Sequence, residues 1–220
     1  MIKILVYMKR LVIVGLVFTL LQVSLMGQKR TVKKTLDQLS EKYEAYKSFD
    51  ISFDLEIMYP ERPLQKQRAR IVQQGVKFIF TSDDQDIHGD GEDVYLYIKD
   101  RNEVQINNFD ENDELGLMTP KDLLKQYKTD QFEYDMEGQT DSDITVIFKP
   151  LDRDSEYSKY RVVIDKEKND FKSIDAFGKD GSKILVTIAD AAYNKTFSQD
   201  FFSFDQSRYP DIRVEDLRID

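Results

Sequence analysis

The chain has 220 residues, enough for one domain with a sizeable hydrophobic core. Aromatic residues reach 12%, too many for a disordered acidic chain, and the net charge of −9 argues against nucleic acid as a partner. The chain has no cysteine, which excludes disulfides, thiolate catalysis and lipid attachment through cysteine. The single histidine, His88, excludes multi-histidine metal sites and leaves a serine triad only one candidate base.

Residues 1–27 have the order of a secretory signal peptide. Basic residues precede an apolar run that starts at Leu11, and small residues follow it. We expect cleavage at the end of this segment, which leaves residues 28–220 as one domain. The alternative is a retained membrane anchor, for which the apolar run is short. Both Met1 and Met8 are candidate initiators, since two basic residues also follow Met8.

The next two segments have clear periodicity. In residues 31–47 apolar side chains recur at steps of three and four, which predicts an amphipathic helix. Residues 51–59 alternate between apolar and polar side chains, which is typical of a half-buried strand. Pro60 and Pro63 end that strand.

Strand patterns then continue to the C-terminal part of the chain. They lie at residues 70–72, 76–80, 93–98, 103–106, 144–148, 160–164, 172–177 and 184–188. Gly75 and residues 178–181 supply turns between them, and Thr119-Pro120 marks the start of an inserted helix. We therefore predict a mainly β (α+β) fold, with one antiparallel sheet of about nine to eleven strands that must curl.

The densest polar cluster lies at residues 83–91. A calcium-binding loop is one interpretation, but both possible alignments place a tyrosine where the bidentate glutamate is required. We interpret the cluster as a solvated turn that carries His88 on the surface. No nucleophile motif or phosphate-binding loop accompanies it, so we expect no enzymatic activity, metal or cofactor.

Apolar side chains alternate along several predicted strands and so share a face of each strand. The residues expected to face the interior are Phe53, Leu55, Ile57, Phe78, Phe80, Val94, Leu96, Ile98, Ile106, Val146 and Phe148. Asp54, Glu56 and Lys77 are expected to face outward, as are Tyr95 and Tyr97, whose hydroxyls can reach water. The interior is either a filled core or an apolar cavity for a lipid or small molecule, and composition leaves both open.

Three segments resemble sequences of the LolA family, in the same order and with similar spacing. They are residues 90–97, which are similar to the family's Asp-Gly-x-x-aliphatic-Trp-x-Tyr hairpin, residues 103–106 followed by Leu117 and Thr119-Pro120, and the ending at residues 201–205 and 209–218. The resemblance covers nearly all of residues 31–218.

The resemblance implies an unclosed β-barrel with helices that form a lid over an apolar interior. It implies a monomeric, non-enzymatic carrier in the periplasm of a Gram-negative bacterium. Such a carrier takes acylated lipoproteins from an inner-membrane ABC-type transporter and releases them at the outer membrane, where an acceptor is possible. The lid would include Leu117, Met118, Leu123, Leu124 and Tyr127.

Two positions depart from the family pattern. Tyr95 stands where the family usually has tryptophan, and Gln73-Gln74-Gly75 stands where a cavity arginine is expected. We therefore do not transfer the role of that arginine. A second hypothesis remains open, in which the same fold serves as a lipid sensor whose acidic surface binds a regulator. The short, single-domain chain favours the carrier.

Overall fold

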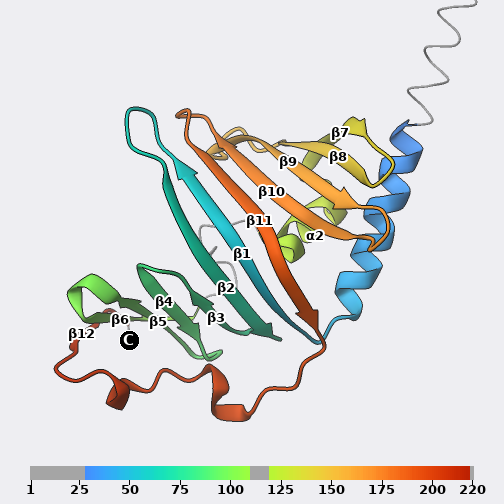
Figure 1. The fold of residues 1–220 in the computed structure, drawn as a ribbon. Coiled ribbons are helices and arrows are strands. Elements are labelled where there is room, and N and C mark those ends of the chain that lie inside the picture. The colour runs from blue at the N-terminus through green and yellow to red at the C-terminus, as the bar shows by residue number, and fades with distance from the viewer. Residues whose placement is uncertain (1–27, 110–118, 219–220) are drawn as a thin grey trace, which may run out of the picture.

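The computed structural model describes residues 28–109 and 119–218. In this part of the chain, twelve strands form one open, curled sheet (Figure 1). The strands are β1 (Ser48–Met58), β2 (Gln65–Gln74), β3 (Lys77–Thr81), β4 (Gln85–Gly89), β5 (Asp93–Ile98), β6 (Glu103–Asn108), β7 (Phe132–Gln139), β8 (Asp143–Pro150), β9 (Tyr157–Asp165), β10 (Asp170–Gly178), β11 (Lys183–Tyr193) and β12 (Arg213–Asp216). Across the sheet they follow the order β12-β6-β5-β4-β3-β2-β1-β11-β10-β9-β8-β7.

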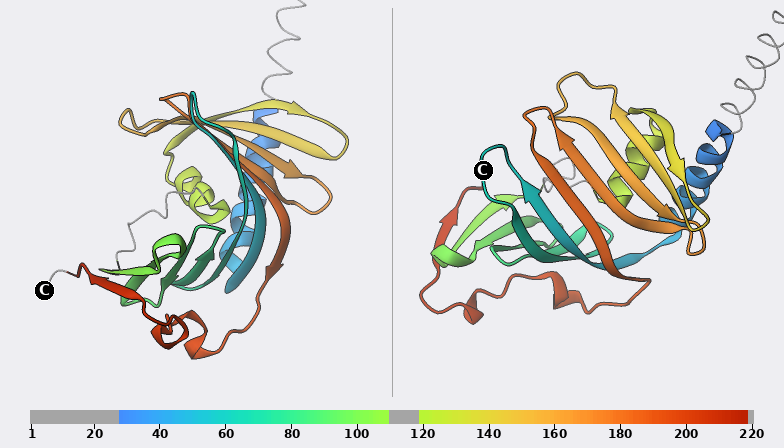
Figure 2. Two further views of the ribbon diagram at one scale, coloured as in Figure 1. Left: turned by 60° about the vertical axis from the view of Figure 1, so that its left-hand side comes forward. Right: turned by 45° about the horizontal axis from the view of Figure 1, so that its top comes forward.

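Most neighbours in this order are consecutive strands, and the exceptions are β1 with β11 and β6 with β12. β1 lies at the centre, with β2 to β6 on one side and β11 to β7 on the other. Figure 2 shows that the sheet curls without closing, so the prediction of an unclosed, curled sheet is confirmed. The predicted count of strands was too low, and the sheet is mixed rather than fully antiparallel, because β12 pairs with β6 in parallel.

Two helices cover one half of the inner face. The N-terminal helix is described over residues 28–45, and α2 runs over Pro120–Lys128 (Figure 2). Thr119 is the N-cap of α2, and its hydroxyl accepts from the Asp122 main chain in a capping box. Short 3-10 helices are η1 (Lys99–Arg101), η2 (Gln199–Phe202) and η3 (Gln206–Arg208). Both predicted helices therefore form, and α2 starts at the predicted proline.

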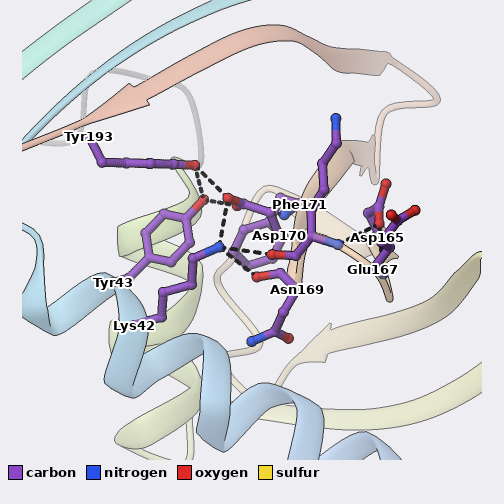
Figure 3. Close-up of polar contacts among 9 residues, drawn as sticks. Lys42, Tyr43, Asp165, Glu167, Asn169, Asp170, Phe171 and Tyr193 are labelled. Atoms are coloured by element: carbon purple, nitrogen blue, oxygen red, sulfur yellow. Dashed lines mark hydrogen bonds and ion pairs between the residues drawn. The ribbon is translucent and has the colours of Figure 1, made fainter.

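Asp170, at the start of β10, anchors the N-terminal helix to the sheet (Figure 3). Its carboxylate accepts from the Tyr43 hydroxyl at 2.6 Å and the Tyr193 hydroxyl at 2.9 Å, and forms an ion pair with Lys42 at 3.0 Å. Burial raises the pKa of Tyr43 far above its usual range, which keeps the hydroxyl a donor. The polar groups are satisfied by one another, which is typical of a structural network.

Removing this carboxylate should weaken the docking of the helix. We expect Asp170→Ala to lower the free energy of unfolding by about 2–3 kcal/mol, because two tyrosine hydroxyls and one lysine lose a shared acceptor. Urea denaturation would measure the loss. Asp165→Ala is the matched control in the same hairpin, since the Asp165 carboxylate accepts from the main chain of its own turn and not from the helix in the described part of the chain. A loss in the control as large as that in Asp170→Ala would contradict this role for Asp170.

Residues 194–212, here called the C-terminal strap, cover the outer face of β3 to β6 (Figure 1). The strap begins beside β1, where Asn194 donates to the main chain of Ser48. Phe204 stacks on Tyr95 with ring centroids 5.5 Å apart and on Tyr209 at 5.1 Å. A second apolar layer therefore lies on the outer face of this half of the sheet.

In this half of the sheet, three predictions from the sequence are corrected. Tyr95 and Tyr97 do face outward, but they are half-buried against Phe204 rather than open to water. Residues 85–89 form strand β4, so the polar cluster is not a single turn. His88 is half-buried in that strand, 5.5 Å from the Phe204 ring, and burial lowers its pKa.

A buried carboxylate holds the start of the strap. Asp50 accepts from Arg70 at 2.7 and 2.8 Å and from Lys195, the second strap residue, at 2.7 Å. The Arg70 hydrogen bonds are the main reason that the pKa of Asp50 falls from 3.8 to about 2. Because the folded-state pKa is depressed, this stabilisation is present above pH 3.8 and is lost as the pH falls through 2.

Asp50 should therefore contribute to acid sensitivity. We expect the stability gap between the wild type and Asp50→Asn to shrink by about 2 kcal/mol between about pH 5 and pH 2. Urea titrations at several pH values would measure it. A gap that stays constant over this range would contradict the assignment.

Candidate functional site

The strand register joins one continuous apolar face across the sheet. Residues that pair directly in neighbouring strands place their side chains on the same face. On the helix-covered half, Val146 pairs with Val162, Val162 with Ile174, Ile174 with Val186, and Val186 with Leu55. This row runs from β8 to the central strand β1.

A second row continues the face in the other direction. Ile51 pairs with Ile71, Ile71 with Phe80, Phe80 with Ile87, and Ile87 with Leu96. The row runs from β1 to β5 and remains apolar throughout. The curl of the sheet makes this shared inner face concave (Figure 2).

The two halves of the face differ in how they are covered. Under the helices, Val146 and Phe148 are fully buried in one cluster with Leu123 and Leu124 of α2. The cluster around β1 to β4 contains no residue from the described parts of either helix. Aliphatic side chains on the inner side of β1, β4, β5 and β11 remain partly exposed, and we call them the open inner face: Ile57, Ile87, Val94, Leu96, Ile98, Ile184, Val186 and Ile188.

Polar side chains border the open inner face at β6. Glu103, Gln105 and Asn107 pair with Ile98, Leu96 and Val94, so they lie on the same face. Gln105 donates to Glu103 at 3.1 Å, and Arg213 of β12 forms an ion pair with Glu103 at 3.3 Å. The apolar face thus ends at a polar margin, which suits a ligand with an apolar body and a polar end.

Ten of the eleven predicted cavity residues lie on the inner side of the sheet, in three groups. Ile57, Val94, Leu96 and Ile98 belong to the open inner face, while Phe53, Leu55, Phe78 and Phe80 are buried on the same side of the sheet. Val146 and Phe148 lie in the core under the helices.

The prediction was wrong for Ile106. It pairs with Tyr95 and therefore lies on the outer face. Ile106 and Val104 face outward with Tyr95 and Tyr97, whose rings the strap covers.

The predicted lid is placed only in part. Leu123 and Leu124 are buried in the core under the helices, and Tyr127 packs against that core. The Tyr127 hydroxyl donates to Asp37 of the N-terminal helix at 2.8 Å. Leu117 and Met118 lie outside the described residues. Whether α2 moves as a lid remains a prediction.

Sequence reasoning missed four residues of the open inner face. Ile87 was hidden in the polar cluster now seen as β4. Ile184, Val186 and Ile188 show the same alternation as the chosen strands, so that signal was available. In residues 28–109 and 119–218, no group of three or more histidine and acidic side chains could hold a metal ion. The eight side chains of the open inner face are aliphatic, so this face can bury apolar groups.

Comparison with known proteins identifies the family. The sequence profile described as "Outer membrane lipoprotein carrier protein LolA" matches residues 72–205, which is more than half of the chain. The chain belongs to the LolA family. A search of curated protein sequences gives no match. No helix in the described part of this LolA-family chain is long and apolar enough to span a membrane.

Three solved structures are similar to this chain at low sequence identity. An uncharacterized conserved protein from Thermus thermophilus has 9% identity and a TM-score of 0.54, with 84% of this chain and 99% of that chain covered. A LolA superfamily protein from Nitrosomonas europaea has 12% identity and a TM-score of 0.42, with coverages of 79% and 97%. A DUF1329 family protein from Desulfovibrio piger has 11% identity and a TM-score of 0.44, with coverages of 81% and 98%. The likeness to the Thermus protein concerns the fold alone.

The position of the family's cavity arginine is occupied differently here. Gln73 lies on the inner face, paired with Phe49 and Phe78, and its amide donates to the main chain of Gly75 at 3.0 Å. Arg70 points to the opposite face, where it binds Asp50. Gln73 therefore places an uncharged amide on the inner face, and the one arginine of β2 near it, Arg70, lies on the outer face.

Proposed function

We propose that this LolA-family protein is a periplasmic carrier for the acyl chains of lipoproteins. Residues 1–27 would direct export and be removed. An inner-membrane ABC-type transporter would supply the cargo, which would be released at the outer membrane. The protein would act by binding and release, without a catalytic group.

The observation that supports this proposal is the open inner face. Its eight aliphatic side chains are partly exposed and lie together on the concave side of the sheet. Each CH₂ of an acyl chain that leaves water for such a surface gains about 0.8 kcal/mol. The polar margin formed by Glu103, Gln105 and Asn107 leaves a place for the polar end of the cargo.

Photo-crosslinking in cells would test the proposal. A photoreactive amino acid at Leu96 should form adducts with lipoproteins, because this residue belongs to the open inner face. The same amino acid at Glu56, on the outer face, is the matched control and should form none. Phe148 adds a further comparison, since it is fully buried under the helices and should react only if they move.

The adduct pattern decides between the possibilities. Adducts at Glu56 but not at Leu96 would mean that the cargo uses the other face of the sheet. Adducts at neither position, with equal amounts of folded protein, would contradict the carrier function. Native mass spectrometry of the purified protein would independently detect bound acyl chains.

A further inference from the structure

Strand β2 has a partner on both sides over only half of its length. It pairs with β1 from Gln65 to Gln74, whereas β3 pairs only with Arg70–Gln74. Among the described residues, no strand pairs with Gln65–Ala69 on the second side. Figure 1 shows this part of β2 extending beyond the smaller strands β3 to β6. We call residues 65–69 the free edge.

The main-chain groups at the free edge can be assigned from the hairpin that follows. Gln74 and Lys77 flank a two-residue turn, and residues in this position exchange hydrogen bonds. Alternate residues of an antiparallel strand direct their N–H and C=O groups to the same side. Lys66 and Arg68 therefore direct these groups away from β1 and toward the free edge.

The free edge borders the open inner face. Gln65 pairs with Ile57, and Gln67 pairs with Leu55, so both glutamine side chains lie on the inner side. The side-chain oxygen of Gln67 is buried and has no hydrogen-bond partner. An unpaired buried acceptor is unfavourable, and a bound group with an N–H donor would satisfy it.

The charged side chains on the outer side of the free edge are already paired with acidic residues of β1. Lys66 forms an ion pair with Glu56, and Arg68 forms one with Asp54 at 3.5 Å. The charged side chains are therefore engaged across the β1–β2 pair and do not select a particular partner charge. What remains available at the edge is the main chain.

We propose that the free edge of β2 binds the extended peptide that follows the acylated residue of a lipoprotein, as an added strand. This inference rests on the proposed function. In a lipoprotein the acyl chains and the peptide are joined at one residue. If the acyl chains lie on the open inner face, the peptide must leave the protein at the margin of that face. The free edge lies at that margin. The amide at the junction reaches Gln67, and main-chain hydrogen bonds hold the peptide independently of its sequence.

Two synthetic probes separate peptide binding from acyl-chain binding. The first is a triacylated cysteine amide, and the second is the same group followed by a short extended peptide. If the peptide adds a strand, the wild-type protein should bind the second probe about tenfold more tightly than the first. Hydrogen exchange should show protection of the Lys66 and Arg68 amides with the second probe only.

Arg68→Pro and Arg68→Ala form a matched pair of variants. Both lose the ion pair with Asp54, but only proline removes the N–H at the free edge, where proline is tolerated. The affinity ratio between the probes should fall to about one in Arg68→Pro and stay near ten in Arg68→Ala. Equal melting temperatures would establish that both variants fold.

The results separate the two hypotheses. If neither probe binds the wild type, the proposed carrier function itself is wrong. If both probes bind with the same affinity, or Arg68→Pro keeps the tenfold ratio, the acyl site stands and strand addition at the free edge is overturned.

Discussion

Replacing Leu96 with glutamate is expected to abolish acyl-chain binding while the protein stays folded. Leu96 lies in the open inner face between Ile87 and Gln105, and its side chain is already partly exposed. A carboxylate there can stay hydrated in the empty protein but would be buried by an acyl chain. Burying an unpaired charge costs several kcal/mol, so the affinity should fall at least about 100-fold.

Displacement of a fluorescent acyl probe would measure the affinity, and a melting curve would test folding. Leu96→Ala is the size control and should weaken binding far less, because it removes apolar area without adding charge. Glu56→Gln is the control on the outer face and should leave binding unchanged. Unchanged affinity in Leu96→Glu would exclude this strand from the binding face.

The largest effect on stability is expected for Phe148→Ala. Phe148 is 0% exposed at the centre of the core that joins both helices to β7 to β10. Its ring contacts Phe132 edge-on, with the centroids 5.5 Å apart. Truncation removes the buried ring and leaves a cavity between rigid elements, which should cost about 3–5 kcal/mol of unfolding free energy.

Chemical denaturation would measure this cost. Leu151→Ala is the matched control, since Leu151 lies close in the chain but is 53% exposed, and it should change stability by less than about 0.5 kcal/mol. A cost for Phe148→Ala similar to that of the control would mean that the helices do not pack on this core in solution.

Several elements of the fold follow from the amino-acid sequence alone. Periodicity identified the N-terminal helix, and Thr119-Pro120 marked the start of α2, because capping and the geometry of proline act locally. Alternation correctly placed Phe78 and Phe80 on one face of β3, and Val94, Leu96 and Ile98 on one face of β5. The large number of predicted strands also indicated that the sheet must curl.

Other features depended on contacts between distant segments. Alternation shows which residues share a face, but not which segment covers that face. Residues 85–89 were predicted as a turn because they are polar, yet β3 and β5 pair with them on both sides. The sequence of β5 is apolar on both faces, and only the structure shows that the strap covers its tyrosines.

Ile106 illustrates the physical reason most directly. Its strand alternates as predicted, but Ile106 lies on the outer side with Tyr95, and the strap covers that side. The same reason explains why sequence could not separate a filled core from an open face. Val146 and Leu96 have equivalent patterns along their strands, yet helices bury the first and leave the second partly exposed. The local pattern determined which side chains are apolar, and tertiary packing decided which of them remain available for a ligand.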